Sequence, residues 1–145
     1  MFLQKGSLMQ FHTTTQYAIR VLSYIAKNGK DRLYSAKELS DILTIPYKFL
    51  TKIMCELVKS NFVNSIRGRE GGYELAKPSN EISIHDILET FKDLEDDTKC
   101  VLGIGRCDNK NKCVLHDQCY KPRESLREMY KTTTLDKLEE QDFKM

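Results

Sequence analysis

Apolar residues recur at helical spacing along the first third of the chain, and this pattern predicts three helices. The first covers residues 14–27 and the second covers 35–45, where Ser35 and Glu38 form the capping box that typically opens a helix. The third follows a short break and begins at Pro46, in a first turn that tolerates proline.

The third predicted helix has an apolar side and a polar side when it is drawn at about 100° per residue. Its apolar side collects Phe49, Leu50, Ile53, Met54 and Leu57. Its polar side collects Lys48, Thr51, Lys52, Cys55, Glu56 and Lys59. We therefore expect the apolar side to pack and the polar side, with its three lysines, to face outward. Cys55, alone in this polar arc, is interpreted as a small, partly exposed residue.

A change of pattern predicts a β-hairpin over residues 62–77. The segments FVNSI and YEL are strand-like, and the turn RGREGG between them is rich in glycine and carries Arg67 and Arg69. Helix, break, helix and arginine-tipped hairpin are together typical of a winged helix-turn-helix. In such a fold one helix enters the major groove of DNA and the wing reaches the minor groove.

The predicted DNA contacts follow from this layout. They are Lys48, Thr51 and Lys52 at the start of the third helix and Arg67 and Arg69 on the wing. Taken singly, each of these residues is more typical of a solvated surface, and only their combination favours DNA binding.

The second half of the chain predicts further helices. One begins at Ser83, an acidic stretch covers 93–97, a longer helix covers about 120–132 after the cysteines, and TTLDKLEE predicts a final short turn. One side of the longer helix carries Leu126, Met129 and Tyr130. The fold is therefore expected to be mainly α, with a small β-hairpin wing and a long C-terminal helix.

Composition narrows the classes of protein to which the chain could belong. Its 145 residues, 40% hydrophobic and 30% charged, suit one domain with a packed core. A net charge of only +2 means that a nucleic-acid surface has to be a local patch. No apolar run approaches the roughly 18 residues of a membrane span, so we expect a cytoplasmic protein without membrane contact. No nucleophile–base pair or nucleotide loop is visible, so an enzyme is not expected.

Four of the five cysteines gather in one segment, KCVLGIGRCDNKNKCVLHDQCYK, which also holds His116. Thiolates are soft donors that suit zinc and iron–sulfur clusters, and Gly103 and Gly105 allow tight folding around a bound centre. The gaps of five and six residues fit zinc knuckles poorly and also differ from ferredoxin spacing. A cluster is favoured, with zinc, thiol-based redox sensing and no ligand role as alternatives.

Three stretches resemble the Rrf-two type of bacterial winged-helix transcriptional regulators, which include IscR, NsrR and RirA. They are QYAIRVLSYIA, FLTKIMCELVKSNFVNSIRGREGGYELAKP and the cysteine segment. The similarity covers about residues 9–138, and the RGxxGGYxL wing and the ending TTLDKL are specific to the family. The resemblance implies a homodimer that binds a double-stranded DNA operator. Its subunits would pair through the helix after the cysteines, with interface candidates Leu126, Met129 and Tyr130.

The resemblance also implies a set of cluster ligands. The three cysteines of the cluster-binding members are matched by Cys100, Cys107 and Cys113. His116 matches the histidine that completes the 2Fe–2S site of IscR. The aspartate that serves NsrR-type 4Fe–4S sites is matched by Gln16, a poor ligand, so a 2Fe–2S cluster is expected rather than a 4Fe–4S cluster. Cys119 is an additional thiol and the alternative fourth ligand, and the first cysteine gap is six residues where IscR has five.

The resulting hypothesis is a repressor that senses redox state, nitric oxide or iron–sulfur status through a cysteine-ligated iron–sulfur cluster. The alternative is a regulator of the same type that uses zinc, thiol oxidation or a small ligand. The expected organisation is a possible N-terminal extension (1–8), a winged helix-turn-helix domain (9–80), a connecting helix and acidic linker (81–99), a cysteine-rich cluster-binding loop (100–119) and a dimerisation helix with its tail (120–145).

Overall fold

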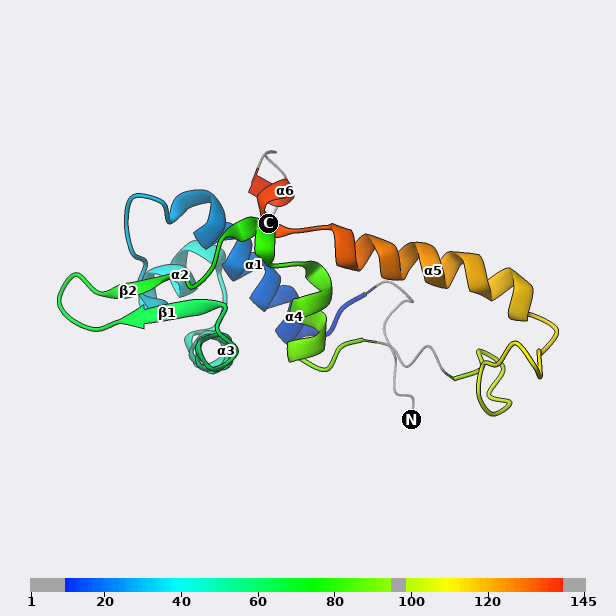
Figure 1. Ribbon diagram of the computed structural model, residues 1–145. Helices are drawn as coiled ribbons and strands as arrows, with labels where there is room; N and C mark the ends of the chain where they lie inside the picture. The colour runs from blue at the N-terminus through cyan, green and yellow to red at the C-terminus, as the bar shows by residue number, and fades with distance from the viewer. Residues whose placement is uncertain (1–9, 95–98, 140–145) are drawn as a thin grey trace.

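The structure, a computed structural model, describes residues 10–94 and 99–139 (Figure 1). The possible extension over 1–8, most of the acidic stretch and the end of the tail lie outside the described residues. The elements are α1 (Thr13–Asn28), α2 (Ala36–Leu43), α3 (Tyr47–Lys59), β1 (Val63–Ile66), β2 (Gly72–Leu75), the short helix η1 (Ser79–Glu81), α4 (Ile84–Thr90), α5 (His116–Thr132) and α6 (Leu135–Glu139). The expected mainly α fold with a two-stranded wing is confirmed.

The core of the N-terminal body lies between α1, α2 and α3. The helix predicted over 14–27 is confirmed as α1, and Ala18, Val21 and Leu22 on its inner face are fully buried. α1 packs against both α2 and α3. Complete burial of one large aliphatic side chain contributes roughly 1.5–3 kcal/mol, so this apolar face is enough to hold α1 against α3.

The turn between α2 and α3 is held at both ends. The predicted capping box is present: the Glu38 N–H donates to the Ser35 hydroxyl at 3.2 Å, and the Ser35 N–H donates to the Glu38 carboxylate at 2.8 Å. Thr44 ends α2 in the left-handed region, with a φ of 54°. Ile45 is buried, and the Ser40 hydroxyl donates to its carbonyl at 2.6 Å. These contacts fix the angle between the two helices.

The third predicted helix is confirmed as α3, with two differences. It begins at Tyr47, and Pro46 lies just before the first turn rather than in it. Leu50 and Leu57 are buried as expected, but the assignment of Phe49 to the packed side is wrong, since this side chain is 56% exposed. On the helical wheel Phe49 lies about 80° from Leu57, at the edge of the apolar stripe, where the core no longer reaches it.

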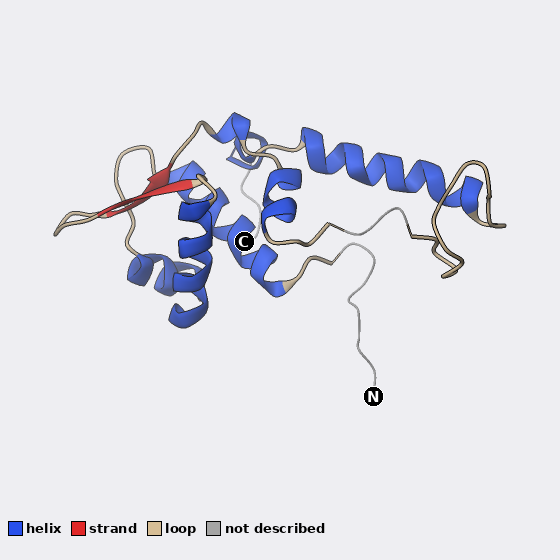
Figure 2. Cartoon of the chain, turned by 60° about the horizontal axis from the view of Figure 1, so that its bottom comes forward, coloured by secondary structure: helices blue, strands red, loops and turns tan. Residues whose placement is uncertain are grey.

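The predicted hairpin is confirmed as the antiparallel strands β1 and β2, with Ile66 opposite Gly72. Figure 2 shows both strands extending away from the helices. The start of β2, next to the turn of the wing, docks on the loop between α1 and α2, where the Tyr73 N–H donates to the Tyr34 carbonyl at 2.8 Å. Gly72 permits this approach, because a Cβ there would lie 2.7 Å from the Tyr34 carbonyl oxygen.

The C-terminal part of the chain returns to the N-terminal body. Ser83 opens α4 with a second capping box, in which the Asp86 carboxylate accepts the Ser83 N–H at 3.0 Å. The predicted final helical turn is confirmed as α6, which packs on α1. Leu135 at its start is fully buried, and its N–H donates to the Ile82 carbonyl at 3.0 Å.

α5 leaves this body as a single helix and carries the cysteine segment at its far end (Figure 1). The expected start near residue 120 is wrong, because the helix begins at His116 and includes Pro122. Proline usually marks a first turn, but here one turn already precedes it, and the Cys119 N–H donates to the Leu115 carbonyl at 2.9 Å. His116 and Cys119 therefore belong to a helix rather than to a loop.

Candidate DNA interface and cysteine centre

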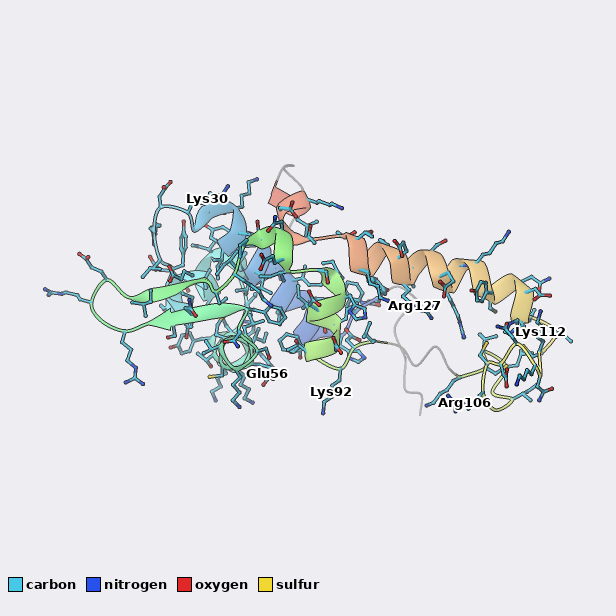
Figure 3. The ribbon with its side chains drawn as sticks, viewed as in Figure 1. Lys30, Glu56, Lys92, Arg106, Lys112 and Arg127 are labelled. Carbon is cyan, nitrogen blue, oxygen red and sulfur yellow. The ribbon has the colours of Figure 1, made fainter. Side chains whose placement is uncertain are left out.

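The outward face of α3 carries the polar residues predicted to contact DNA. Lys48 and Lys52 are exposed, and Thr51 is half-buried with its hydroxyl donating to the Lys48 carbonyl at 3.0 Å. Figure 3 shows this face, marked by Glu56, on the opposite side of the body from Lys30. The three predicted side chains thus share one surface that is open to a DNA groove.

The tip of the wing carries both predicted arginines. Arg67 and Arg69 are exposed on either side of Gly68, which has a φ of 121° and open space where a Cβ would be. The Gly71 N–H donates to the Gly68 carbonyl at 3.1 Å and closes the turn. Two cationic side chains on a turn that projects beyond the helices have the reach that a minor-groove contact requires.

Two aromatic residues at the start of α3 were not among the predicted DNA contacts. Tyr47 is 51% exposed, and Phe49, two positions along and on another side of the helix, is 56% exposed. Exposed aromatic side chains at the start of a helix are available for contact with a partner. Their place in the first turn after Pro46, where a recognition helix enters the groove, was the sequence signal that could have identified them.

Tight backbone turns give the cysteine segment its shape. Lys99 pairs with Arg106 across the first turn, and the Cys100 N–H donates to the Gly105 carbonyl at 3.1 Å. Gly103 and Gly105 have φ values of 73° and 63°, a region that residues with a Cβ rarely adopt. The expectation that these glycines let the backbone fold tightly is confirmed.

The predicted ligands line one cavity. Its volume is about 240 Å³, and the residues around it include Cys100, Cys107, Cys113 and His116. Cys119, the alternative fourth ligand, does not line it. The structure therefore brings the three matched cysteines and the histidine around a shared space at the tip of α5.

Cys100 is the more acidic member of a hydrogen-bonded pair that it forms with Cys113. The backbone N–H groups of Ile104 and Leu102 lower the pKa of the Cys100 thiol most. The Cys113 thiol and the charge of Arg123 lower this pKa further. Cys100 consequently loses its proton at a lower pH than Cys113.

The pKa of Cys113 moves in the opposite direction. The Leu115 N–H acts to lower it, but the hydrogen bond with Cys100, partial burial and the charges of Cys100 and Cys119 together outweigh that contact and raise the pKa. The influence of Cys119 also places this thiol near Cys113.

His116 forms the second pair with Cys107. The imidazole residue is only 6% exposed, and its Nδ1 lies 3.4 Å from the Cys107 Sγ. Its Nε2 lies 2.9 Å from the Asn109 Oδ1, and the ring stacks on Tyr120 with centroids 6.5 Å apart. Sequence reasoning gave Asn109 no role, because its contact with His116 depends on the turn between them.

The four donors stand as two pairs rather than as one tight shell. Among the described residues, the three ligand side chains whose donor atoms all lie within 4.8 Å of one another are His85, Asp86 and Glu89 on α4. Asp86 in that group already accepts the capping N–H of Ser83. Gln16 is also engaged elsewhere, since its amide donates to the Phe11 carbonyl at 2.7 Å.

The predicted dimer-interface residues do not share one environment. Leu126 and Tyr130 are half-buried and line a cavity of about 300 Å³ with His85 of α4, and the Tyr130 ring contacts Phe11 at a centroid distance of 5.7 Å. Met129 is exposed. In the described ranges, no helix combines the length and the apolar character needed to cross a membrane.

Comparisons with known proteins agree on one family. The family profile of Rrf2, described as an iron-dependent transcriptional regulator, matches residues 11–141. An HTH-type transcriptional regulator of Aquifex aeolicus is 36% identical over 132 residues, which cover 90% of this chain and 91% of that protein. The HTH-type transcriptional regulator NsrR of Shouchella clausii is 38% identical over 111 residues, which cover 77% of this chain and 71% of NsrR.

Solved structures with the same fold include two regulators. CymR of B. subtilis, a global cysteine regulator, has a TM-score of 0.78 at 20% identity, covering 93% of this chain and 100% of CymR. IscR of T. potens has a TM-score of 0.69 at 22% identity, covering 95% of each chain. At these identities the two structures establish the shared fold.

Proposed function

Because the chain belongs to the Rrf2 family of transcriptional regulators, we propose that it is a homodimeric repressor controlled by an iron–sulfur cluster. The signal would be redox state, nitric oxide or iron–sulfur supply. The observation that carries the proposal is the cavity that Cys100, Cys107, Cys113 and His116 line at the tip of a helix, in the same small chain as an exposed cationic DNA-reading face.

The DNA-reading role is supported by shape and charge together. α3 presents Lys48, Thr51 and Lys52 outward, and a single α-helix fits the major groove. Arg67 and Arg69 at the wing tip suit the narrow minor groove, where negative potential is concentrated. With a net charge of only +2, one protomer would bind weakly, and a dimer would read two half-sites about one helical turn apart.

Dimerisation is supported by the position and composition of α5. This helix of 17 residues leaves the body, and the element against which it makes most of its contacts is the short α4. An isolated helix of about that length is marginal in water, and Pro122 inside it costs about 3 kcal/mol more. A second copy packed along α5, with the exposed Met129 among its contacts, would supply the missing stabilisation.

The donor set fits a 2Fe–2S cluster. Each iron of such a cluster takes two protein ligands, and the chain offers its donors as two pairs, Cys100 with Cys113 and Cys107 with His116. One zinc ion needs four donors around a single point, so the two pairs would first have to close on each other to hold it. When bound, the cluster would supply a one-electron couple. Arg123 and the N-terminal end of α5 would offset the thiolate charge.

Described contacts connect the ligand segment to the reading helix. The Arg123 guanidinium donates to the Lys99 carbonyl at 3.2 Å and ties α5 to the start of the segment. Tyr130 near the other end of α5 contacts Phe11, just before α1, and α1 packs directly on α3. A rearrangement of the ligand residues would therefore change the tilt of α3 and its fit to a half-site.

The ligand assignment is tested on protein purified without oxygen, with iron and sulfide assayed on the sample that gives the visible spectrum. Wild type is expected to hold about two iron and two sulfide per chain. His116→Ala should lose or destabilise the cluster. Cys119→Ala is the matched control, because Cys119 lies three positions further along α5 and does not line the cavity, and it should retain the cluster. A colourless wild type, or retention by His116→Ala with loss in Cys119→Ala, would contradict the assignment.

A second candidate is thiol sensing, which the contact between Cys100 and Cys113 favours. Hydrogen peroxide would take two electrons and two protons from the two thiols, giving one disulfide and two water molecules. This candidate predicts a Cys100–Cys113 disulfide in peroxide-treated, metal-free protein and a change in its operator affinity. Cys113→Ser would abolish both.

A further inference from the structure

Asn109 lies in a turn whose backbone is fixed by its neighbours. The Asp108 carboxylate accepts the Lys110 N–H at 2.8 Å, and the Asn111 N–H donates to the Asp108 carbonyl at 3.3 Å. An aspartate in this arrangement is typical of an Asx-turn, which sets the direction of the residue that follows it. The Asn109 side chain reaches back from this turn to the imidazole of His116.

The contact selects one tautomer of His116. A neutral imidazole carries one N–H donor and one acceptor nitrogen, and the amide oxygen of Asn109 can only accept. The 2.9 Å contact with that oxygen therefore requires the proton on Nε2. Nδ1 is then the nitrogen with the free lone pair, and it is the nitrogen that lies 3.4 Å from the Cys107 sulfur.

His116 also separates two cavities. The cavity of about 240 Å³ on one side is lined by the three matched cysteines and His116, and Asn109 is not part of its lining. A second cavity, of about 200 Å³, is lined by Asn109, Tyr120 and Arg123 together with Cys107 and His116. Asn109 thus contacts His116 from outside the space that the predicted ligands share.

We propose that Asn109 is a positioning residue that holds His116 as the Nε2–H tautomer and presents Nδ1 as the ligand nitrogen beside Cys107. The inference deepens the proposed function and, for its metal-binding consequence, rests on it. A ligating imidazole nitrogen has to be unprotonated, and the hydrogen bond made by the other nitrogen commonly decides which one is free. A buried histidine with a purely structural role would also need a hydrogen-bond partner. In that case, however, the metal affinity of the protein would not depend on which imidazole nitrogen carries the proton.

The tautomer is measured directly on metal-free, full-length protein labelled with ¹⁵N-histidine, at about pH 8, where an ordinary imidazole is neutral. Wild type is expected to show protonated Nε2 and unprotonated Nδ1 at His116. Asn109→Ala should produce a mixture of tautomers, and Asn109→Asp, which keeps an acceptor oxygen, should restore the wild-type pattern. Asn111→Ala, in the same turn, is the matched control and should leave the pattern unchanged. A proton on Nδ1 in wild type, or an unchanged ratio in Asn109→Ala, would overturn the inference.

Metal affinity gives the second readout, with Co²⁺ as the probe because its visible spectrum reports thiolate and imidazole ligands. Asn109→Ala should weaken Co²⁺ binding about 10- to 100-fold, the usual effect of losing such an outer contact, and Asn109→Asp should stay close to wild type. Equal Co²⁺ affinity in wild type and Asn109→Ala would overturn the ligand role of Nδ1. A wild type with the expected tautomer that binds neither Co²⁺ nor a cluster would instead overturn the proposed function and leave the positioning of His116 by Asn109 standing.

Discussion

The carboxylate of Asp93 holds the start of α1 through two contacts with His12. The His12 backbone N–H donates to Oδ2 at 2.8 Å, and the His12 Nδ1 lies 3.0 Å from Oδ1. The Asp93 side chain is only 7% exposed, whereas that of His12 is 71% exposed. Lys92, with a φ of 54°, turns the chain at the end of α4 and brings Asp93 into this position. The segment that leads to the cysteines is thereby fastened to the helix that packs on α3.

Asp93→Ala is expected to weaken the coupling between the cysteine centre and DNA binding. The ratio of operator affinities between cluster-loaded and cluster-free protein should shrink about fivefold, because one hydrogen bond to a charged acceptor contributes about 1 kcal/mol when its partner is exposed. Fluorescence anisotropy with a labelled operator selected from a random pool measures the ratio. Glu81→Ala, an exposed acidic residue on η1, is the control, and an unchanged ratio in Asp93→Ala would remove Asp93 from the coupling route.

Lys52→Ala is expected to weaken DNA binding in a salt-dependent manner. Each phosphate contact that is lost should reduce the slope of log affinity against log salt by about 0.9. Lys30→Ala removes the same charge from the opposite side of the body and should leave the slope unchanged (Figure 3). The slope comes from binding curves at several salt concentrations, and equal slopes for the two variants would contradict the assignment of the reading face to α3.

Thr44→Gly is expected to stabilise the protein. Thr44 has a φ of 54°, a conformation that is unfavourable for a β-branched residue and accessible to glycine, and its side chain is exposed. The free energy of unfolding should rise by about 1 kcal/mol, as measured by urea denaturation. Ser125→Gly, an exposed position in the interior of α5, should instead lower it by about 0.5 kcal/mol. A loss of stability in Thr44→Gly would mean that the Thr44 side chain stabilises the turn.

Alkylation of metal-free protein should depend on pH differently at Cys100 and Cys113. Because the pKa of Cys100 is lowered, its thiolate forms at a lower pH than that of an ordinary cysteine, and iodoacetamide should modify Cys100 faster than Cys113 near neutral pH. The raised pKa of Cys113 means that its rate should increase only at higher pH. Peptide mass spectrometry after short exposures measures both rates. A faster reaction at Cys113 near neutral pH would reverse the assignment of thiolate and thiol.

Local signals explain why most of the fold could be predicted from the sequence. The capping boxes at Ser35 and Ser83 involve residues only three positions apart, and the amphipathic stripes of α1 and α3 repeat within a few turns. The start of α5 was missed because Pro122 is a strong start signal, whereas the preceding turn is stabilised by contacts that no local pattern records. Phe49 was misassigned because a helical wheel does not show where the core ends.

The candidate sites likewise contain residues that could be predicted from the sequence and residues that could not. Cysteine is a common ligand of metals and iron–sulfur clusters, so Cys100, Cys107 and Cys113 could be predicted as ligands from their residue type. His116 was added to the predicted ligands because of its position after Cys113 and because of the family resemblance. The contact of Asn109 with His116 depends on the path of an exposed turn, and that of His12 with Asp93 joins residues 81 positions apart. Such relationships follow from the folded backbone, so sequence reasoning could name the donors but not the residues that orient or connect them.

The central claim, that the state of the cysteine centre sets DNA affinity, is tested most directly by one comparison. The Kd for a single operator fragment is measured without oxygen on one preparation, first loaded with iron and sulfide and then stripped of them, beside the variant in which Cys100, Cys107 and Cys113 are all alanine. The account predicts that the two wild-type Kd values differ by about tenfold or more and that the variant matches the stripped protein under both treatments. Equal Kd values for loaded and stripped wild type would contradict it.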